Sequence, residues 1–147
     1  MGSKSGIRSW IGVQLAALGI ELLIGMAVNL WVQIPARHPG TDDAHYLSGL
    51  WVGIVWVLRH GGILVATHIL LALALWLSSI GIFAAAARSG SWRLGLWTLI
   101  GWVGITGAGF NGGSFVNYGL NLSSFLMTVG LVVAVAGYLI AWGGGGR

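Results

Sequence analysis

Long apolar runs broken by short polar segments are the feature that most constrains how this chain can fold. A transmembrane helix needs roughly 20 consecutive, mostly apolar residues. Four stretches reach that length, at about 10–32, 63–87, 94–114 and 120–142. Hydrophobic residues make up 56% of the 147 residues and charged residues only 7%, which is more apolar surface than a soluble domain of this length can bury. The sequence therefore predicts an integral membrane protein.

One apolar stretch is too long for a single span. Residues 47–87 are interrupted by the run Arg59–Gly62. We therefore predict a short amphipathic or re-entrant helix at about 47–58, on the outer side of the membrane, ahead of the span at 63–87. The whole chain, 1–147, is then a single all-α transmembrane domain, a four-helix bundle with one additional short amphipathic helix.

Basic residues indicate the orientation of the spans. Arg37 and Arg59 fall on one side of the predicted membrane together with both aspartates, and five basic residues fall on the other. These five are Lys4, Arg8, Arg88, Arg93 and Arg147. Because cytoplasmic loops carry the excess of Lys and Arg, the sequence predicts a multi-pass protein of a bacterial-type cytoplasmic membrane with both its N-terminus and its C-terminus in the cytoplasm.

Several functional classes are excluded because the chain lacks the residues they need or does not group them together. Cysteine is absent, which excludes disulfides, thiolate catalysis, iron–sulfur clusters and cysteine-ligated zinc. The net charge of +4 comes from basic residues spread along the chain, so no nucleic-acid partner is expected. The sequence contains no nucleophile elbow, HExxH zinc motif or pair of intramembrane carboxylates, which favours a non-enzymatic role.

Polar side chains inside the predicted spans gather toward the outer side. A charged side chain at mid-bilayer costs about 2.5–3.5 kcal/mol on insertion scales, so it is rarely incidental. Glu21 lies halfway along the first span and His68 lies about two turns into the second. The inner half offers little beyond Gln14, so we expect an outward-facing pocket covered by residues 47–58. Its predicted polar lining is Glu21, Asn29, Asn111, Asn117, Asn121 and Ser124.

These polar residues have structural as well as functional interpretations. The asparagines and serines favour interhelical hydrogen bonding, a standard device in membrane bundles. Glu21 is equally consistent with a protonated structural carboxyl and with proton handling. His68 differs, because a neutral imidazole in an apolar span packs poorly and binds metal well, which favours haem iron as its partner.

Two sequence segments resemble a known family. The first span reads VQLAALGIELLIGMAVNLWVQIP and the second contains HGGILVATHILLALALWL. They resemble the Gln-x-x-x-x-Gly span and the following histidine-bearing span in one half of the haem A synthase family, whose four-helix bundles hold haem through histidines near the outer leaflet. By this resemblance Gln14 and Gly19 match the first motif, and His68 matches the haem-ligating position. In the segments MAVNLWVQIPARHPG and GAGFNGGSFVNYGLNLSSFLM the chain also resembles small four-helix membrane proteins of actinobacterial type, a likeness that implies the architecture only.

The chain departs from the haem A synthase pattern in ways that bear on haem binding. That family has a duplicated bundle, and its bundles take two histidines from different helices. Here there is one bundle, without histidine in the third and fourth predicted spans. His60 and His68 on one helix would lie about 12 Å apart along its axis. A haem b would therefore be five-coordinate, take a second ligand from His45 or His60 on a folded-back segment, or lie between two His68 side chains of a symmetric dimer.

Three functions are compatible with these features. The first is a small haem b-binding bundle in electron transport, a carrier or a subunit associated with the respiratory chain, with His68 on the iron and His60 and His45 as further cofactor-binding candidates. The second is a cofactor-free accessory subunit that uses glycine-rich faces, including Gly104, to form a homo-oligomer or to dock into a larger membrane complex. The third is a small-solute or proton pathway through Glu21 and His68.

Overall fold

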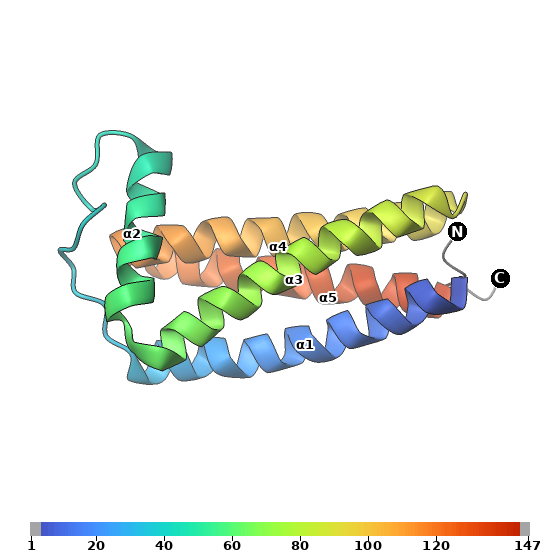
Figure 1. The fold of residues 1–147 in the computed structure, drawn as a ribbon, viewed down its shortest axis with the longest axis horizontal. Coiled ribbons are helices and arrows are strands. Elements are labelled where there is room, and N and C mark those ends of the chain that lie inside the picture. The colour runs from blue at the N-terminus through green and yellow to red at the C-terminus, as the bar shows by residue number, and fades with distance from the viewer. Residues whose placement is uncertain (1–3, 145–147) are drawn as a thin grey trace.

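The computed structural model describes residues 4–144, and these residues form five α-helices (Figure 1). The helices are α1 (Lys4–Trp31), α2 (Tyr46–His60), α3 (Gly62–Arg88), α4 (Trp92–Tyr118) and α5 (Asn121–Gly144). No strand occurs in this described part of the chain, so the predicted all-α class is confirmed. Arg147, one of the residues used to predict the orientation, lies outside the described residues.

Four helices run lengthwise beside one another, and α2 lies across one end of them (Figure 1). α4 and α5 form the most extensive helix pair, while α1 packs on α3 and on α5. α2 packs on α3 and α4, and the loop of residues 32–45 runs along its far side. Residues 32–60 thus cover one end of the bundle, and we call them the roof. The two described ends of the chain lie at the opposite end (Figure 1).

Three helices are long and apolar enough to cross a membrane: Ser5–Trp31 within α1, Gly62–Arg88 and Asn121–Gly144. α4 has the same length as α3, 27 residues, but its glycines, threonines and asparagines lower its mean hydropathy. The three apolar helices indicate a membrane protein, as the sequence predicts.

The predicted helix bounds differ from the structure most at the start of α1, which begins at Lys4 and not near residue 10, and next most at the end of α4. The third span was expected to end near 114, but α4 continues to Tyr118. It stops where Gly119 adopts a φ of 60° and donates its N–H to the carbonyl oxygen of Phe115 at 2.8 Å. Glycine is the usual residue at such a left-handed helix end, because it has no Cβ to clash. The extension places Asn117 on the helix, beside α2.

A glycine pair turns the chain from α2 into α3. Gly62 has a φ of +81°, in the left-handed region that favours glycine. A Cβ on Gly61 would lie 2.7 Å from the carbonyl oxygen of Val57, closer than real side chains come. The break predicted at residues 59–62 is therefore confirmed, and it marks the change from a helix across the bundle to one along it.

Glycines let α4 and α5 approach closely. A Cβ on Gly104 would lie 2.6 Å from the carbonyl oxygen of Gly130, and one on Gly137 would lie 2.8 Å from the backbone nitrogen of Gly101. Gly101 also makes room for the ring of Tyr138, which is completely buried. In lipid, such close backbone approach gains the dispersion contacts that hold helices together.

Candidate functional site

The structure brings together the two ionisable residues that the sequence places within the spans. Nδ1 of His68 on α3 lies 2.8 Å from Oε1 of Glu21 on α1. The two side chains are 24% and 10% exposed, so both are largely withdrawn from the surface. Gly25 makes room for the imidazole, because a Cβ there would lie 3.0 Å from Cε1 of His68. Since Glu21 and Gly25 are one helical turn apart, a single face of α1 both contacts and accommodates His68.

The contact between Glu21 and His68 leaves one oxygen of the Glu21 carboxyl free to form a further hydrogen bond. Oε2 of Glu21 has no hydrogen-bond partner among residues 4–144, and the alignment of Nδ1 with Oε1 falls short of a well-formed hydrogen bond despite the short distance. When one proton is added to the glutamate carboxylate and the neutral imidazole, the pair is net neutral whichever of the two side chains carries it. A proton can therefore move between Glu21 and His68 without leaving an unpaired charge in apolar surroundings, which would be costly.

The pair lies in the half of the bundle nearer the roof. Glu21 precedes Trp31, the last residue of α1, by ten residues, and His68 follows Gly62, the first residue of α3, by six. At 1.5 Å per residue, Glu21 and His68 lie about 15 Å and about 9 Å from those helix ends. Both side chains thus lie below the roof and well inside the length of the bundle.

The half of the bundle away from the roof buries several polar side chains, so the expectation that it offers little beyond Gln14 was wrong. Gln14 is buried and donates from Nε2 to the carbonyl oxygen of Leu75 at 2.9 Å. Ser79, Thr98 and Tyr138 are also buried there. The hydroxyls of Ser79 and Thr98 donate to carbonyl oxygens of their own helices. Because such bonds need no partner helix, nothing in the sequence distinguishes a buried hydroxyl from a lipid-facing one.

A stack of rings that the sequence analysis missed holds the roof. His38 stacks on Trp56 with ring centroids 4.9 Å apart, and Trp56 stacks on His60 at 5.0 Å. Nε2 of His38 lies 2.9 Å from the carbonyl oxygen of Val116 on α4. His38 is buried and so ties the 32–45 loop to both α2 and α4. A lone histidine between two prolines in a polar loop carries no periodic signal for burial, so this role was not predictable.

The structure does not group the three predicted cofactor-binding histidines. His45 immediately precedes α2 and His60 ends it, so they lie about 22 Å apart along a helix of 15 residues. The imidazole of His60 bonds through Nδ1 to the carbonyl oxygen of Trp56 at 2.9 Å, while His68 contacts Glu21. In the described range 4–144, no three His, Asp or Glu side chains are placed to hold one metal ion. One iron therefore does not take both His45 and His60.

The other predicted polar residues do not converge on the pair. Asn111 donates from Nδ2 to a carbonyl oxygen of its own helix at 2.8 Å. Asn29 and Asn121 are exposed, and Ser124 is half-buried. Asn117 is different, because it is buried where α2 meets α4 and neither polar atom of its side-chain amide has a partner in the described part of the chain. It belongs to the contact between the roof and α4.

These features define a class: an all-helical protein with helices of membrane-spanning length and a Glu–His pair between two of them. No family model matches the chain, and no curated protein or solved structure matches it. The resemblance to the haem A synthase family thus stays a prediction, and the proposals that follow are built on this chain's own geometry.

Proposed function

We propose that this chain is a four-span membrane protein that binds a proton at the Glu21–His68 pair and passes it across the membrane. The pair carries the proposal, because a carboxyl and an imidazole lie 2.8 Å apart between two helices of span length. Intramembrane acids and histidines in contact are typical of proton relays. One proton can occupy either side chain, so uptake of another on one side of the membrane with release on the other completes a transfer.

The geometry of α4 supports a fourth span. Its 27 residues extend about 40 Å, which exceeds the hydrocarbon core of roughly 30 Å. It packs along α5, a helix apolar enough to cross the membrane. Together with α1, α3 and α5 it makes an even number of spans, which agrees with the placement of both termini in the cytoplasm that the basic residues predict.

Polar side chains in the half of the bundle away from the roof support a route for the proton. His68, the member of the pair nearer to the roof, keeps 24% of its side chain exposed. Toward the other end, Gln14 lies two turns before Glu21 on α1, and Ser79 and Tyr138 are buried in the same half of the bundle. Two turns of helix span about 10 Å, so water molecules must bridge Glu21 and Gln14 during transfer.

Proton flux into proteoliposomes tests the proposal. We expect a potassium diffusion potential to drive proton uptake, read by a trapped pH-sensitive dye. Glu21→Gln should abolish it, because glutamine keeps the shape of the side chain but cannot release a proton. Asp42→Asn is the matched control, since it makes the same chemical change at an exposed loop carboxyl. Wild-type flux no greater than that of empty liposomes, or undiminished flux in Glu21→Gln, would overturn the proposal.

The orientation of His68 favours haem b binding as a second candidate function. Because Glu21 contacts Nδ1, Nε2 is the nitrogen left to bind iron, and a carboxylate on the other ring nitrogen is typical of histidines that hold metals. Since the ring of His60 is held on Trp56 by a hydrogen bond and by stacking, and His45 lies at the other end of α2, this haem would be five-coordinate or shared between two copies of the chain. Such a bundle would serve electron transport in association with the respiratory chain.

An absorption spectrum separates the two candidate functions. If the bundle binds haem, protein produced with adequate haem and purified in detergent shows a Soret band. We then expect His68→Ala to remove the band and His60→Ala, a matched change on the roof, to leave it in place. A colourless wild-type preparation would contradict haem binding and leave the proton pathway standing.

A further inference from the structure

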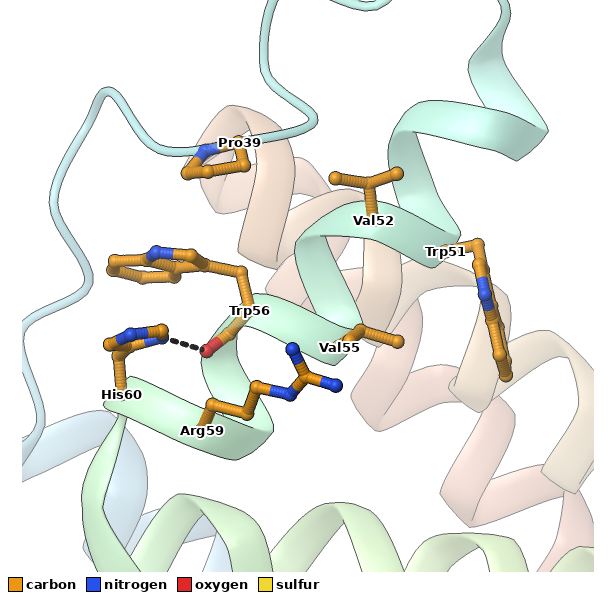
Figure 2. Close-up of a pocket in the computed structure, with 7 residues that line it drawn as sticks. All are labelled: Pro39, Trp51, Val52, Val55, Trp56, Arg59 and His60. Carbon is orange, nitrogen blue, oxygen red and sulfur yellow. Dashed lines mark hydrogen bonds between the residues drawn. The ribbon is translucent and has the colours of Figure 1, made fainter.

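An open pocket of about 330 Å³ lies on one side of α2 (Figure 2). Its lining residues are Pro39, Trp51, Val52, Val55, Trp56, Arg59 and His60. All but the proline come from α2, and Figure 2 shows the two tryptophans on opposite sides of the pocket with the valines between them. The lining includes neither member of the Glu21–His68 pair, so this pocket is separate from the proposed proton site.

The lining combines apolar walls with one permanent cation. The guanidinium of Arg59 lies beside Val55 in Figure 2, and it forms no ion pair or hydrogen bond within residues 4–144. Arginine does not lose its proton in proteins, and its planar fork of donors matches the oxygens of a phosphate. The ring of Trp56 is held in place by its stacking on His38 and His60. The pocket thus presents a fixed apolar wall next to an unneutralised charge.

The acidic side chains of the roof lie at the other end of α2. Asp43 accepts hydrogen bonds from the backbone N–H of His45 at 2.9 Å and from the hydroxyl of Ser48 at 2.8 Å. These two bonds lower the pKa of Asp43, so its carboxylate stays ionised and engaged at the start of the helix. The 15 residues of α2 separate that end from Arg59 by about 20 Å, well beyond ion-pair distance.

We propose that this pocket binds an anionic phospholipid, with the headgroup phosphate on Arg59 and the glycerol and first chain carbons against Val52, Val55 and Trp51. α2 lies across the bundle at the level where the long helices end, which is the headgroup level for helices that cross the membrane (Figure 1). A basic side chain at a membrane surface attracts anionic lipid headgroups, and tryptophan favours the membrane–water interface. A volume of about 330 Å³ suits a headgroup and the upper part of the chains.

Lipid retention measured by native mass spectrometry tests the proposal. The protein is released from vesicles of equal parts phosphatidylglycerol and phosphatidylcholine, and the lipid that stays bound is identified. We expect one phosphatidylglycerol per chain. Arg59→Gln should lower its retention about fivefold, the change expected from losing one basic side chain at a membrane surface. Arg37→Gln, the same change at an exposed roof arginine outside the pocket, should leave retention unchanged.

Two further measurements test whether the lipid binds in this pocket and whether its chains are needed for binding. Val55→Trp fills the pocket and keeps the charge, so it should also lower retention. Free glycerol 1-phosphate should not displace the bound lipid, because it lacks the chains that the apolar wall contacts. Equal retention of both lipids, equal losses in the two arginine variants, or displacement by glycerol 1-phosphate would each overturn the proposal.

Discussion

Gly104→Ala is expected to destabilise the bundle by about 3 kcal/mol, the upper end of the usual cost of overpacking. A Cβ at this position would lie 2.5 Å from the backbone nitrogen of Ala134 and 2.6 Å from the carbonyl oxygen of Gly130. Both are backbone atoms of α5, so no side chain can rotate away and the two helices must separate. Since α4 and α5 form the most extensive helix pair, their separation weakens the whole bundle.

Thermal unfolding in detergent, followed by circular dichroism, measures this effect against a matched control. Gly107→Ala makes the same change one turn further along α4, where a Cβ meets nothing within 4 Å. Alanine favours helix over glycine by about 0.5–1 kcal/mol, so this variant should be neutral or slightly more stable. If both variants lost the same stability, close packing of α4 on α5 would not be the cause.

Because Gly104 faces α5 of its own chain, Gly107 is the position to substitute when docking of an accessory subunit is tested.

Glu21→Ala is expected to cost about 3 kcal/mol, the lower end of the range for removing one partner of a buried pair. The lower end applies because the His68 side chain keeps 24% of its surface exposed. His68→Ala should cost a similar amount, because it leaves an acid without its partner in an apolar bundle. The double variant should cost less than the sum, since the second substitution removes a group that the first has already left unpaired.

A double-mutant cycle from thermal unfolding of the four proteins measures that coupling. Additive losses would show that the 2.8 Å contact between Glu21 and His68 contributes no stability. Glu21→Gln should fall between wild type and Glu21→Ala, because the amide keeps the volume of the side chain. A Glu21→Gln protein that folds but passes no proton would separate the role of this carboxyl in transfer from its role in packing.

The sequence was sufficient to predict the helices, because each membrane span has to meet the requirements of the lipid bilayer within its own segment. Backbone groups within a bilayer must be bonded inside the segment, and about 20 apolar residues are needed to cross. The break at Arg59–Gly62 separated α2 from α3 for an equally local reason, since Gly62 adopts a conformation that favours glycine. Where the sequence analysis stopped short, at the end of α4, polar residues such as Asn117 continued a helix whose end is set by Gly119.

The candidate site was predictable only in part. Glu21 and His68 were each singled out, because an ionisable group in an apolar run is expensive wherever it lies. Their pairing was not predicted, and neither was the place of His45 and His60 at opposite ends of α2, about 22 Å apart. Buried Ser79 and Tyr138 were missed because the sequence of a span that is apolar throughout does not indicate which of its faces packs against another helix.

The sequence by itself thus determined that the chain is helical, where the helices break and which ionisable residues stand out. Only the tertiary structure decided which faces of the helices meet. It placed Glu21 against His68, Gly104 but not Gly107 against α5, and α2 across the bundle. The physical reason is that whether a segment forms a membrane-spanning helix depends on the residues of that segment alone. The rotation of each helix about its axis depends instead on how it packs against its neighbours.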